Sequence, residues 1–149
     1  MDKLNAACEC GHVKYEISGH PLFRVYCHCT ICQKFNDAPF GDVVVYKSAH
    51  VSDPEVQSVE YMTLKPPPNV QRGKCVKCLN PAIDKIKSPL FPKLTIVPAI
   101  VHTDISTLPS SMAHIFYDKR INDANDSLPK HSGFISSQLA FGKLILTSK

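Results

Sequence analysis

Seven cysteines in three short groups constrain this chain more than any other feature of its sequence. They form a C-x-C, a C-x-C-x-x-C and a C-x-x-C pattern, at Cys8/Cys10, Cys27/Cys29/Cys32 and Cys75/Cys78, and none lies outside a group. Such turns bring two sulfurs close enough to share one tetrahedral zinc ion, with bonds of about 2.3 Å. Disulfides are the weaker interpretation, because the count is odd and the N-terminus lacks the apolar region of a secretion signal. The grouping therefore predicts metal-bound thiolates.

The count suggests how the cysteines divide. A structural zinc site has four protein ligands, whereas a catalytic site keeps one position open. The simplest division joins the two two-cysteine turns and leaves Cys27, Cys29 and Cys32 as a three-ligand site. Spacing alone does not prove this division. An isolated C-x-x-C could also be a redox pair or two buried small residues, but three groups together, without a βαβ pattern, favour zinc.

The hydrophobic pattern predicts a mostly β fold. Apolar residues alternate with polar ones over residues 13–17 and 23–27, the period of a half-buried strand, which places Cys27 at a strand end. Thr30 is expected to cap a short helical turn over 31–35. Further strands are expected at 43–46, 59–63, 70–74, 82–86, 94–101 and 113–119. Long amphipathic helices are not expected, and the prolines at 66–68 predict a loop.

Size and composition predict a single globular domain. The chain has 149 residues, of which 44% are hydrophobic and 20% charged. We expect one zinc-binding domain over 1–132 and an extension over 133–149 that suits either a short helix or an added strand. No apolar run approaches the roughly 18 residues of a membrane span. We expect a cytoplasmic chain, with a nuclear location also open.

The charge of the chain does not point to nucleic acid. The formal net charge is +4 with cysteines counted as neutral. Seven thiolates and two Zn²⁺ ions would lower it to about +1. The basic residues are dispersed and form no run interleaved with aromatic side chains. We therefore rank nucleic acid low among the partners.

Several motifs resemble those of a known family, the glutathione-dependent formaldehyde-activating enzymes and centromere protein V, which share a zinc domain related to the Mss4-like fold. The resembling segments are residues 8–17, 27–34, 38–40, 75–78 and 114–116. The resemblance implies a small single-domain Mss4-like β fold with two zinc ions. It assigns the structural zinc to Cys8, Cys10, Cys75 and Cys78, and the second zinc to Cys27, Cys29 and Cys32.

The resemblance also implies a carbon–sulfur lyase or synthase activity. Members join glutathione to formaldehyde to give S-hydroxymethylglutathione, or cleave that product, so a small thiol and a small aldehyde are the expected partners. Zinc with an open position holds a bound thiol deprotonated at neutral pH. Three thiolate ligands leave the centre with one net negative charge, which favours a thiol substrate over hydrolysis. His28 and His114 are candidates to relay the proton, although a histidine in a β protein is more often packed than catalytic.

The competing function is a non-catalytic zinc module that binds a protein partner, as the centromere protein V branch suggests. The second zinc would then be closed by a protein ligand, with candidates His28, His102 and His114.

Other residues bear on substrate binding and on departures from the family. Candidates to meet the carboxylates of a peptide thiol are Arg72, Lys74 and Lys34, although such residues usually cover a solvated face. Leu79 stands where the family usually has glycine, and we expect Asn80 to take the left-handed conformation there. Asp37 also stands where glycine is common, and the chain lacks tryptophan.

Overall fold

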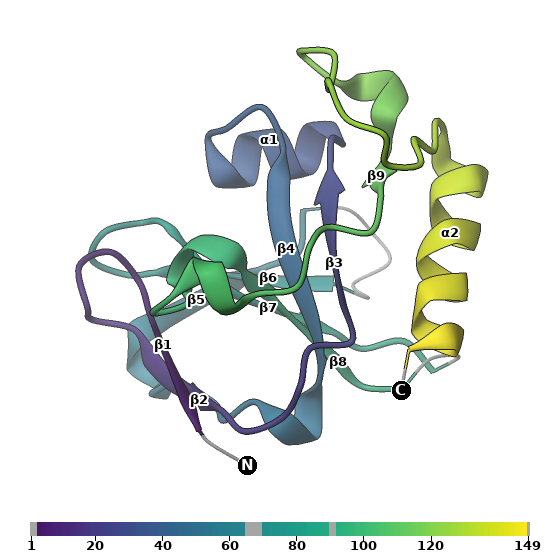
Figure 1. Cartoon of the computed structure of the whole chain (residues 1–149). Helices are drawn as coiled ribbons and strands as arrows, with labels where there is room; N and C mark the ends of the chain where they lie inside the picture. The colour runs from purple at the N-terminus through teal and green to yellow at the C-terminus, as the bar shows by residue number, and fades with distance from the viewer. Residues whose placement is uncertain (1–2, 65–69, 90–91, 149) are drawn as a thin grey trace.

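A seven-stranded sheet and a two-stranded hairpin form most of the computed structural model, which describes residues 3–64, 70–89 and 92–148 (Figure 1). The strands are β1 Leu4–Ala7, β2 Lys14–Ile17, β3 Phe23–Cys27, β4 Gly41–Lys47, β5 Val59–Met62, β6 Val70–Cys75, β7 Pro81–Ile86, β8 Leu94–Pro98 and β9 His114–Ile115. The helices are α1 Thr30–Asn36 and α2 Phe134–Thr147. The prediction of a small, mostly β domain is confirmed. The loop expected at 66–68 lies outside the described ranges.

The large sheet has the strand order β5-β6-β7-β8-β4-β3-β9. Neighbouring strands are antiparallel, except that β3 and β9 run parallel and pair Tyr26 with His114. The hairpin of β1 and β2 forms a separate sheet. Strand β3 is the penultimate strand, next to the edge strand β9, and α1 follows shortly after its last residue, Cys27.

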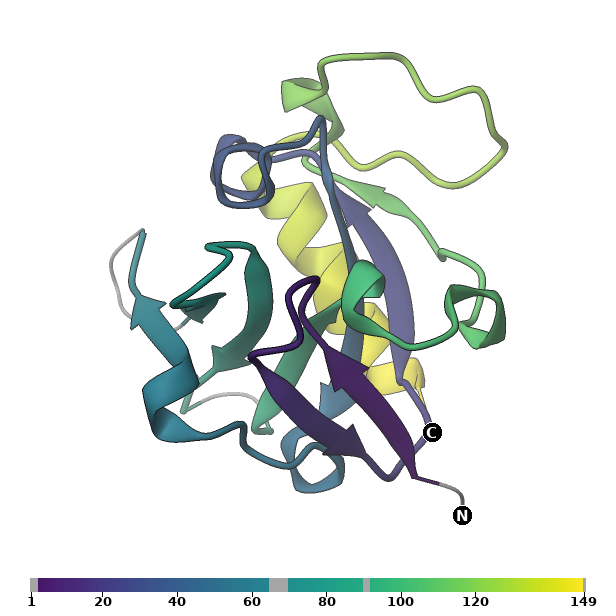
Figure 2. The ribbon, with the colours of Figure 1, turned by 90° about the vertical axis from the view of Figure 1, so that its left-hand side faces the viewer.

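Each face of the large sheet has its own core. Val44 and Tyr46 of β4 belong to the core under the β1–β2 hairpin, and Val43 and Val45 belong to the core under α2. This alternation follows from the two-residue period of a strand. Figure 2 shows the hairpin on the near side of the sheet and α2 on the far side. The cysteines are divided between the two cores. Cys8 and Cys75 belong to the core under the hairpin, and Cys27 and Cys32 belong to the core under α2.

The C-terminal segment, for which helix and strand were both open, is a 14-residue helix. Phe141, Leu144 and Ile145 of this helix pack against the second core. Their spacing of three and four residues places them on one side of a helix. Of the two alternatives for this segment, the helix is therefore the one that forms. Within the described residues, no helix is long and apolar enough to cross a membrane.

Several element boundaries also differ from expectation. The first strand, β1, was not predicted. The strand expected over 94–101 ends at Pro98 and continues as a 3₁₀ turn. The strand expected over 113–119 is only two residues long and is followed by a second 3₁₀ turn, because Phe116 adopts φ +53°. Helix α1 is capped by Cys29 rather than Thr30, since the Cys29 sulfur accepts the hydrogen bond from the Cys32 N–H.

Candidate metal centres

Four sulfurs meet where two turns approach each other. Cys8 and Cys10 lie in the turn from β1 to β2, and Cys75 and Cys78 lie where β6 turns into β7; we call them the four-cysteine cluster. All four sulfurs lie within 4.8 Å of one another. The Cys8–Cys10 and Cys10–Cys75 sulfur distances are 3.5 and 3.7 Å. A tetrahedral zinc with bonds of about 2.3 Å separates its sulfurs by about 3.8 Å, so the cluster fits that ion.

Backbone conformation and backbone N–H groups shape this cluster. Gly11 has φ +76°, which lets the β1–β2 turn close tightly. Leu79 has φ +63°, so the left-handed residue of the second turn is Leu79 itself, and the expectation for Asn80 was wrong. Burial raises the pKa of the Cys75 thiol, but hydrogen bonds from the N–H groups of Cys78 and Lys77 and from the thiols of Cys78 and Cys8 together lower this pKa to about 6. The turn thus favours the thiolate that a metal requires.

The remaining three cysteines form a second group, the three-cysteine cluster. Cys27 is the last residue of β3, Cys29 caps α1, and Cys32 lies in its first turn, at the upper end of β3 in Figure 1. Their sulfurs also lie within 4.8 Å of one another, and the Cys27–Cys29 distance is 3.5 Å. No histidine or carboxylate of the described residues joins these three sulfurs at ligand distance. The donor set fits a zinc ion with an open position.

One sulfur of the three-cysteine cluster is set up as a thiolate. The pKa of Cys29 is lowered to about 2, because Cys27 and Cys32 hydrogen-bond to its sulfur through both thiols and the Cys32 N–H. Hydrogen bonding to Cys29 and Cys32, together with burial, raises the pKa of Cys27 well above its usual range. Three adjacent thiols cannot all ionise without a cation. A divalent ion removes this conflict, which makes the cluster compatible with zinc binding.

A basic pair from β6 lies against Phe35 of α1, the helix that also carries Cys32. The Arg72 guanidinium carbon is 5.6 Å, and the Lys74 ammonium 5.4 Å, from the centroid of the Phe35 ring in α1. The three cysteines help to raise the pKa of Arg72 against the effect of burial. Arg72 also lies 3.4 Å from the buried carboxyl of Asp84, whose pKa burial raises to about 7. Arg72 is therefore shared between the three-cysteine cluster and a buried acid.

His28 and His114 form a hydrogen-bonded chain with an acid that sequence reasoning missed. His28 Nε2 lies 2.8 Å from His114 Nδ1, and His114 Nε2 lies 2.8 Å from an Asp126 carboxylate oxygen. An ionised Asp126 accepts the His114 Nε2–H, so a neutral His114 accepts the His28 Nε2–H at its other nitrogen. Nδ1 of His28 is then an unprotonated nitrogen, buried without a hydrogen-bond partner among the described residues. Burial lowers the pKa of His28, which keeps this ring neutral.

The third candidate histidine has a structural environment. His102 is buried, its Nε2 lies 2.9 Å from the Tyr46 hydroxyl, and its Nδ1 lies 3.1 Å from the carbonyl oxygens of Pro98 and Ala99. These contacts occupy both ring nitrogens. Neither cluster includes His102, so the structure gives no support to its candidacy as a zinc ligand.

Comparison with known proteins places the chain in a family. Residues 3–119 match the model of the glutathione-dependent formaldehyde-activating enzyme family, and the chain belongs to that family. A crystal structure of a Rhodobacter sphaeroides protein has a similar fold, with a TM-score of 0.53 and 13% sequence identity. The match covers 66% of this chain and 86% of that one. Comparison with curated proteins gives no match.

Proposed function

We propose that this chain is a zinc-dependent enzyme that adds a thiol such as glutathione to formaldehyde or another small aldehyde, and that catalyses the reverse carbon–sulfur bond cleavage. Cys8, Cys10, Cys75 and Cys78 would hold a structural zinc. Cys27, Cys29 and Cys32 would hold the second ion at the active site. The observation that carries the proposal is the three-cysteine cluster, which no fourth protein ligand closes among the described residues. Family membership supports the same chemistry.

The reaction needs a thiolate and a place for one proton. The sulfur forms a bond to the aldehyde carbon, the carbonyl π bond breaks, and the oxygen takes up a proton. Zinc held by Cys27, Cys29 and Cys32 would offer an open position and would lower the pKa of a thiol bound there. Cys27, Cys29 and Cys32 hold that position within one strand end and one helical turn. We assign proton transfer to the hydrogen-bonded series of His28, His114 and Asp126. The nitrogen without a partner in this series is Nδ1 of His28, the residue between Cys27 and Cys29.

The charges around the cluster favour an anionic thiol. Three thiolates and one Zn²⁺ carry a net negative charge, which Arg72 offsets from the adjacent strand. Lys74 makes no ion pair with a carboxylate of the described residues, and its ammonium lies over the same Phe35 ring. A peptide thiol with carboxylates, such as glutathione, would therefore find Arg72 beside the cluster and a second cation, Lys74, over the Phe35 ring. The seven free cysteines suit a reducing compartment such as the cytoplasm.

The test is an exchange measurement, because thiols add to formaldehyde without a catalyst. Exchange spectroscopy by NMR would follow glutathione and S-hydroxymethylglutathione at equilibrium while the protein concentration is varied. We expect the exchange rate to rise in proportion to the zinc-loaded protein, and the Cys29→Ser variant to give only the uncatalysed rate. An equal rate for both proteins would refute the enzyme assignment.

Binding is tested separately by calorimetry. Glutathione should bind more tightly than S-methylglutathione, which cannot present a thiolate, and Arg72→Gln should weaken the binding of glutathione more than that of cysteamine, which lacks carboxylates. Equal affinities for glutathione and its S-methyl derivative, combined with no catalysis, would favour the alternative of a zinc module that binds a protein partner.

A further inference from the structure

Two side-chain hydrogen bonds join helix α2 to the segment that follows β9. Ser137 of α2 is completely buried, and its hydroxyl accepts the Phe116 N–H at 2.8 Å. In the other direction, a carboxylate oxygen of Asp118 accepts the N–H of Gly133, the residue before the helix, at 2.6 Å. A carboxylate at this end of a helix also interacts favourably with the helix dipole. The two bonds connect residues 3–119, which match the family model, to a helix that lies beyond them.

The bond from Phe116 supports a strained turn. Phe116 has φ +53°, a conformation that a residue other than glycine keeps only where its surroundings compensate for the strain. The turn ends β9 and begins the 3₁₀ turn at Tyr117. The Tyr117 ring consequently meets the rings of His28 and His114 edge to face, with centroids 5.3 and 5.5 Å away. Ser137 thus stabilises the backbone conformation that places Tyr117 against both histidines.

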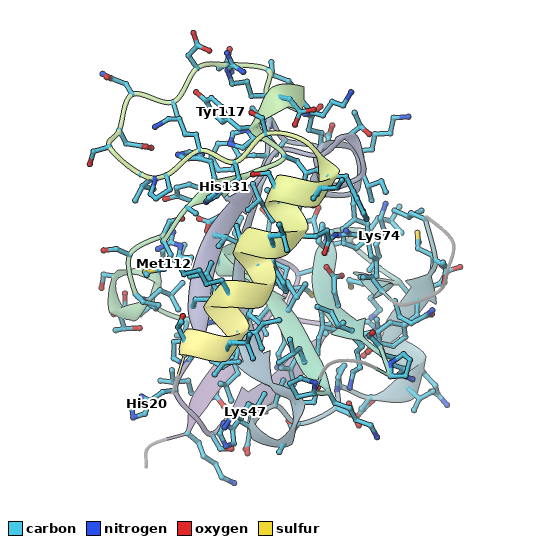
Figure 3. The ribbon with its side chains drawn as sticks, turned by 90° about the vertical axis from the view of Figure 1, so that its right-hand side faces the viewer. His20, Lys47, Lys74, Met112, Tyr117 and His131 are labelled. Carbon is cyan, nitrogen blue, oxygen red and sulfur yellow. The ribbon has the colours of Figure 1, made fainter. Side chains whose placement is uncertain are left out.

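The Ser137 hydroxyl also connects the two ends of the loop that carries Asp126. It donates to the carbonyl oxygen of His131 at 3.3 Å, and the same oxygen accepts the Tyr117 N–H at 2.9 Å. The His131 N–H donates in turn to the His114 carbonyl oxygen, also at 2.9 Å. Figure 3 shows Tyr117 and His131 near the upper end of α2. The ends of the loop are therefore held where the Asp126 carboxylate reaches His114.

This support matters because β9 is short. It pairs with β3 at only two positions, at the edge of the sheet, so few ladder bonds fix His114 relative to His28. We propose that Ser137 is a positioning residue that aligns His28, His114 and Asp126 for proton transfer. The inference rests on the function proposed above. Helix α2 would then act on the reaction through the backbone that follows β9, without touching the substrate.

The kinetic test compares Ser137→Ala with Ser136→Ala, which makes the same change at an exposed position of the same helix. A misplacement of about 1 Å in a catalytic group can lower a rate by about a hundredfold. We expect the catalysed glutathione exchange rate at saturating thiol to fall at least tenfold in Ser137→Ala. The glutathione concentration for half-saturation should stay within twofold, because the hydroxyl bonds only to backbone groups of Phe116 and His131. Ser136→Ala should match the parent in both values.

A second readout needs no substrate. In protein with ¹⁵N-labelled histidine, scalar coupling between His28 Nε2 and His114 Nδ1 reports the 2.8 Å hydrogen bond directly. The zinc-loaded parent and Ser136→Ala should show this coupling, and Ser137→Ala should lose it with unchanged zinc content. If the parent shows no catalysis but Ser137→Ala still loses the coupling, the proposed function fails and the alignment of the two rings by Ser137 is supported.

Asp118→Ala removes the other bond between α2 and the segment after β9. Asp118 is exposed, so this variant tests the same support if Ser137→Ala does not fold. We expect weaker coupling and an exchange rate lowered at least twofold. Ser137→Ala with the parental coupling and rate would overturn the proposal, and so would a loss of zinc from this variant, because the effect would then lie in the metal site. If Ser137→Ala is unfolded, parental coupling and rate in Asp118→Ala would overturn it.

Discussion

Replacement of Cys75 by serine should unfold most of this chain. The Cys75 side chain is completely buried, and its sulfur lies 3.7 Å from that of Cys10, 65 positions earlier in the chain. Zinc at the four-cysteine cluster would therefore connect the β1–β2 hairpin to β6 and β7, which together with β4 and β8 enclose the core under the hairpin. A serine hydroxyl is a poor zinc ligand, and here it would be buried beside three remaining sulfurs.

The expected loss is as large as the stability of the domain. Structural zinc contributes an apparent 10 kcal/mol or more at neutral pH, and this binding energy is folding energy when the unfolded chain has no preformed site. A domain of this size has a net free energy of unfolding of about 5–15 kcal/mol. Loss of one ligand from a closed site thus removes a contribution comparable to the whole margin. We expect insoluble protein, or soluble protein without a cooperative melt.

Cys29→Ser is the matched comparison, because it makes the same chemical change in the other cluster. The ligands of the three-cysteine cluster span only six residues, so their metal closes no long loop. Serine is also a good N-cap and can accept the Cys32 N–H bond that Cys29 accepts now. This variant should remain folded with one zinc fewer and no catalysed thiol exchange. Circular dichroism melts and elemental analysis decide between the two outcomes.

The reverse result would refute this reasoning. If Cys29→Ser unfolds the chain, while Cys75→Ser melts cooperatively and loses only activity, the structural and catalytic assignments of the two clusters are interchanged.

Three further predictions concern backbone strain, metal release and histidine tautomers. Leu79→Gly should raise the free energy of unfolding by about 0.5–1 kcal/mol in denaturant titrations, because glycine adopts the positive φ without strain and Leu79 is 63% exposed; a loss of stability would contradict this. A strong chelator should remove the three-cysteine metal first, with native circular dichroism retained, and simultaneous loss of both metals would argue against an open site. In long-range ¹H–¹⁵N spectra of the zinc-loaded protein, His28 and His114 should both be Nε2–H tautomers, and Asp126→Asn should change the His114 signals; an Nδ1–H tautomer of His114 would contradict the proposed chain.

The cysteine groups were readable from the sequence because their ligands are local. Two sulfurs in a C-x-C or C-x-x-C turn are neighbours in almost any fold, so only the pairing of turns was open. Counting ligands predicted that the first and last turns pair, and the structure brings the sulfurs of these two turns together. Strands with strict alternation, such as β3, were also readable, since a period of two is typical of a half-buried strand and does not fit a helix.

The features that were missed depend on contacts between distant segments. Asp126 lies in a polar loop, and nothing in its neighbourhood distinguishes it from Asp123 until the fold brings it to His114. The left-handed residue was assigned to Asn80 on intrinsic preference, but the hydrogen bond from Leu79 N–H to the Cys75 carbonyl fixes the turn one residue earlier. Helix α2 was ambiguous, because short apolar runs fit either period until a core is present to bury one face.

The candidate metal ligands and the nearby cations come from different elements, which would separate metal binding from substrate choice in the proposed enzyme. All three ligands of the three-cysteine cluster come from one strand end and one helical turn, whereas Arg72 and Lys74 come from β6, which is not a neighbour of β3 in the sheet. A substitution at Arg72 would therefore change the charge that a bound thiol meets without altering any of the three candidate ligands. Arg72→Gln should keep the zinc content while it shifts thiol preference away from carboxylates. Loss of zinc in this variant would mean that Arg72 supports the thiolates rather than the substrate.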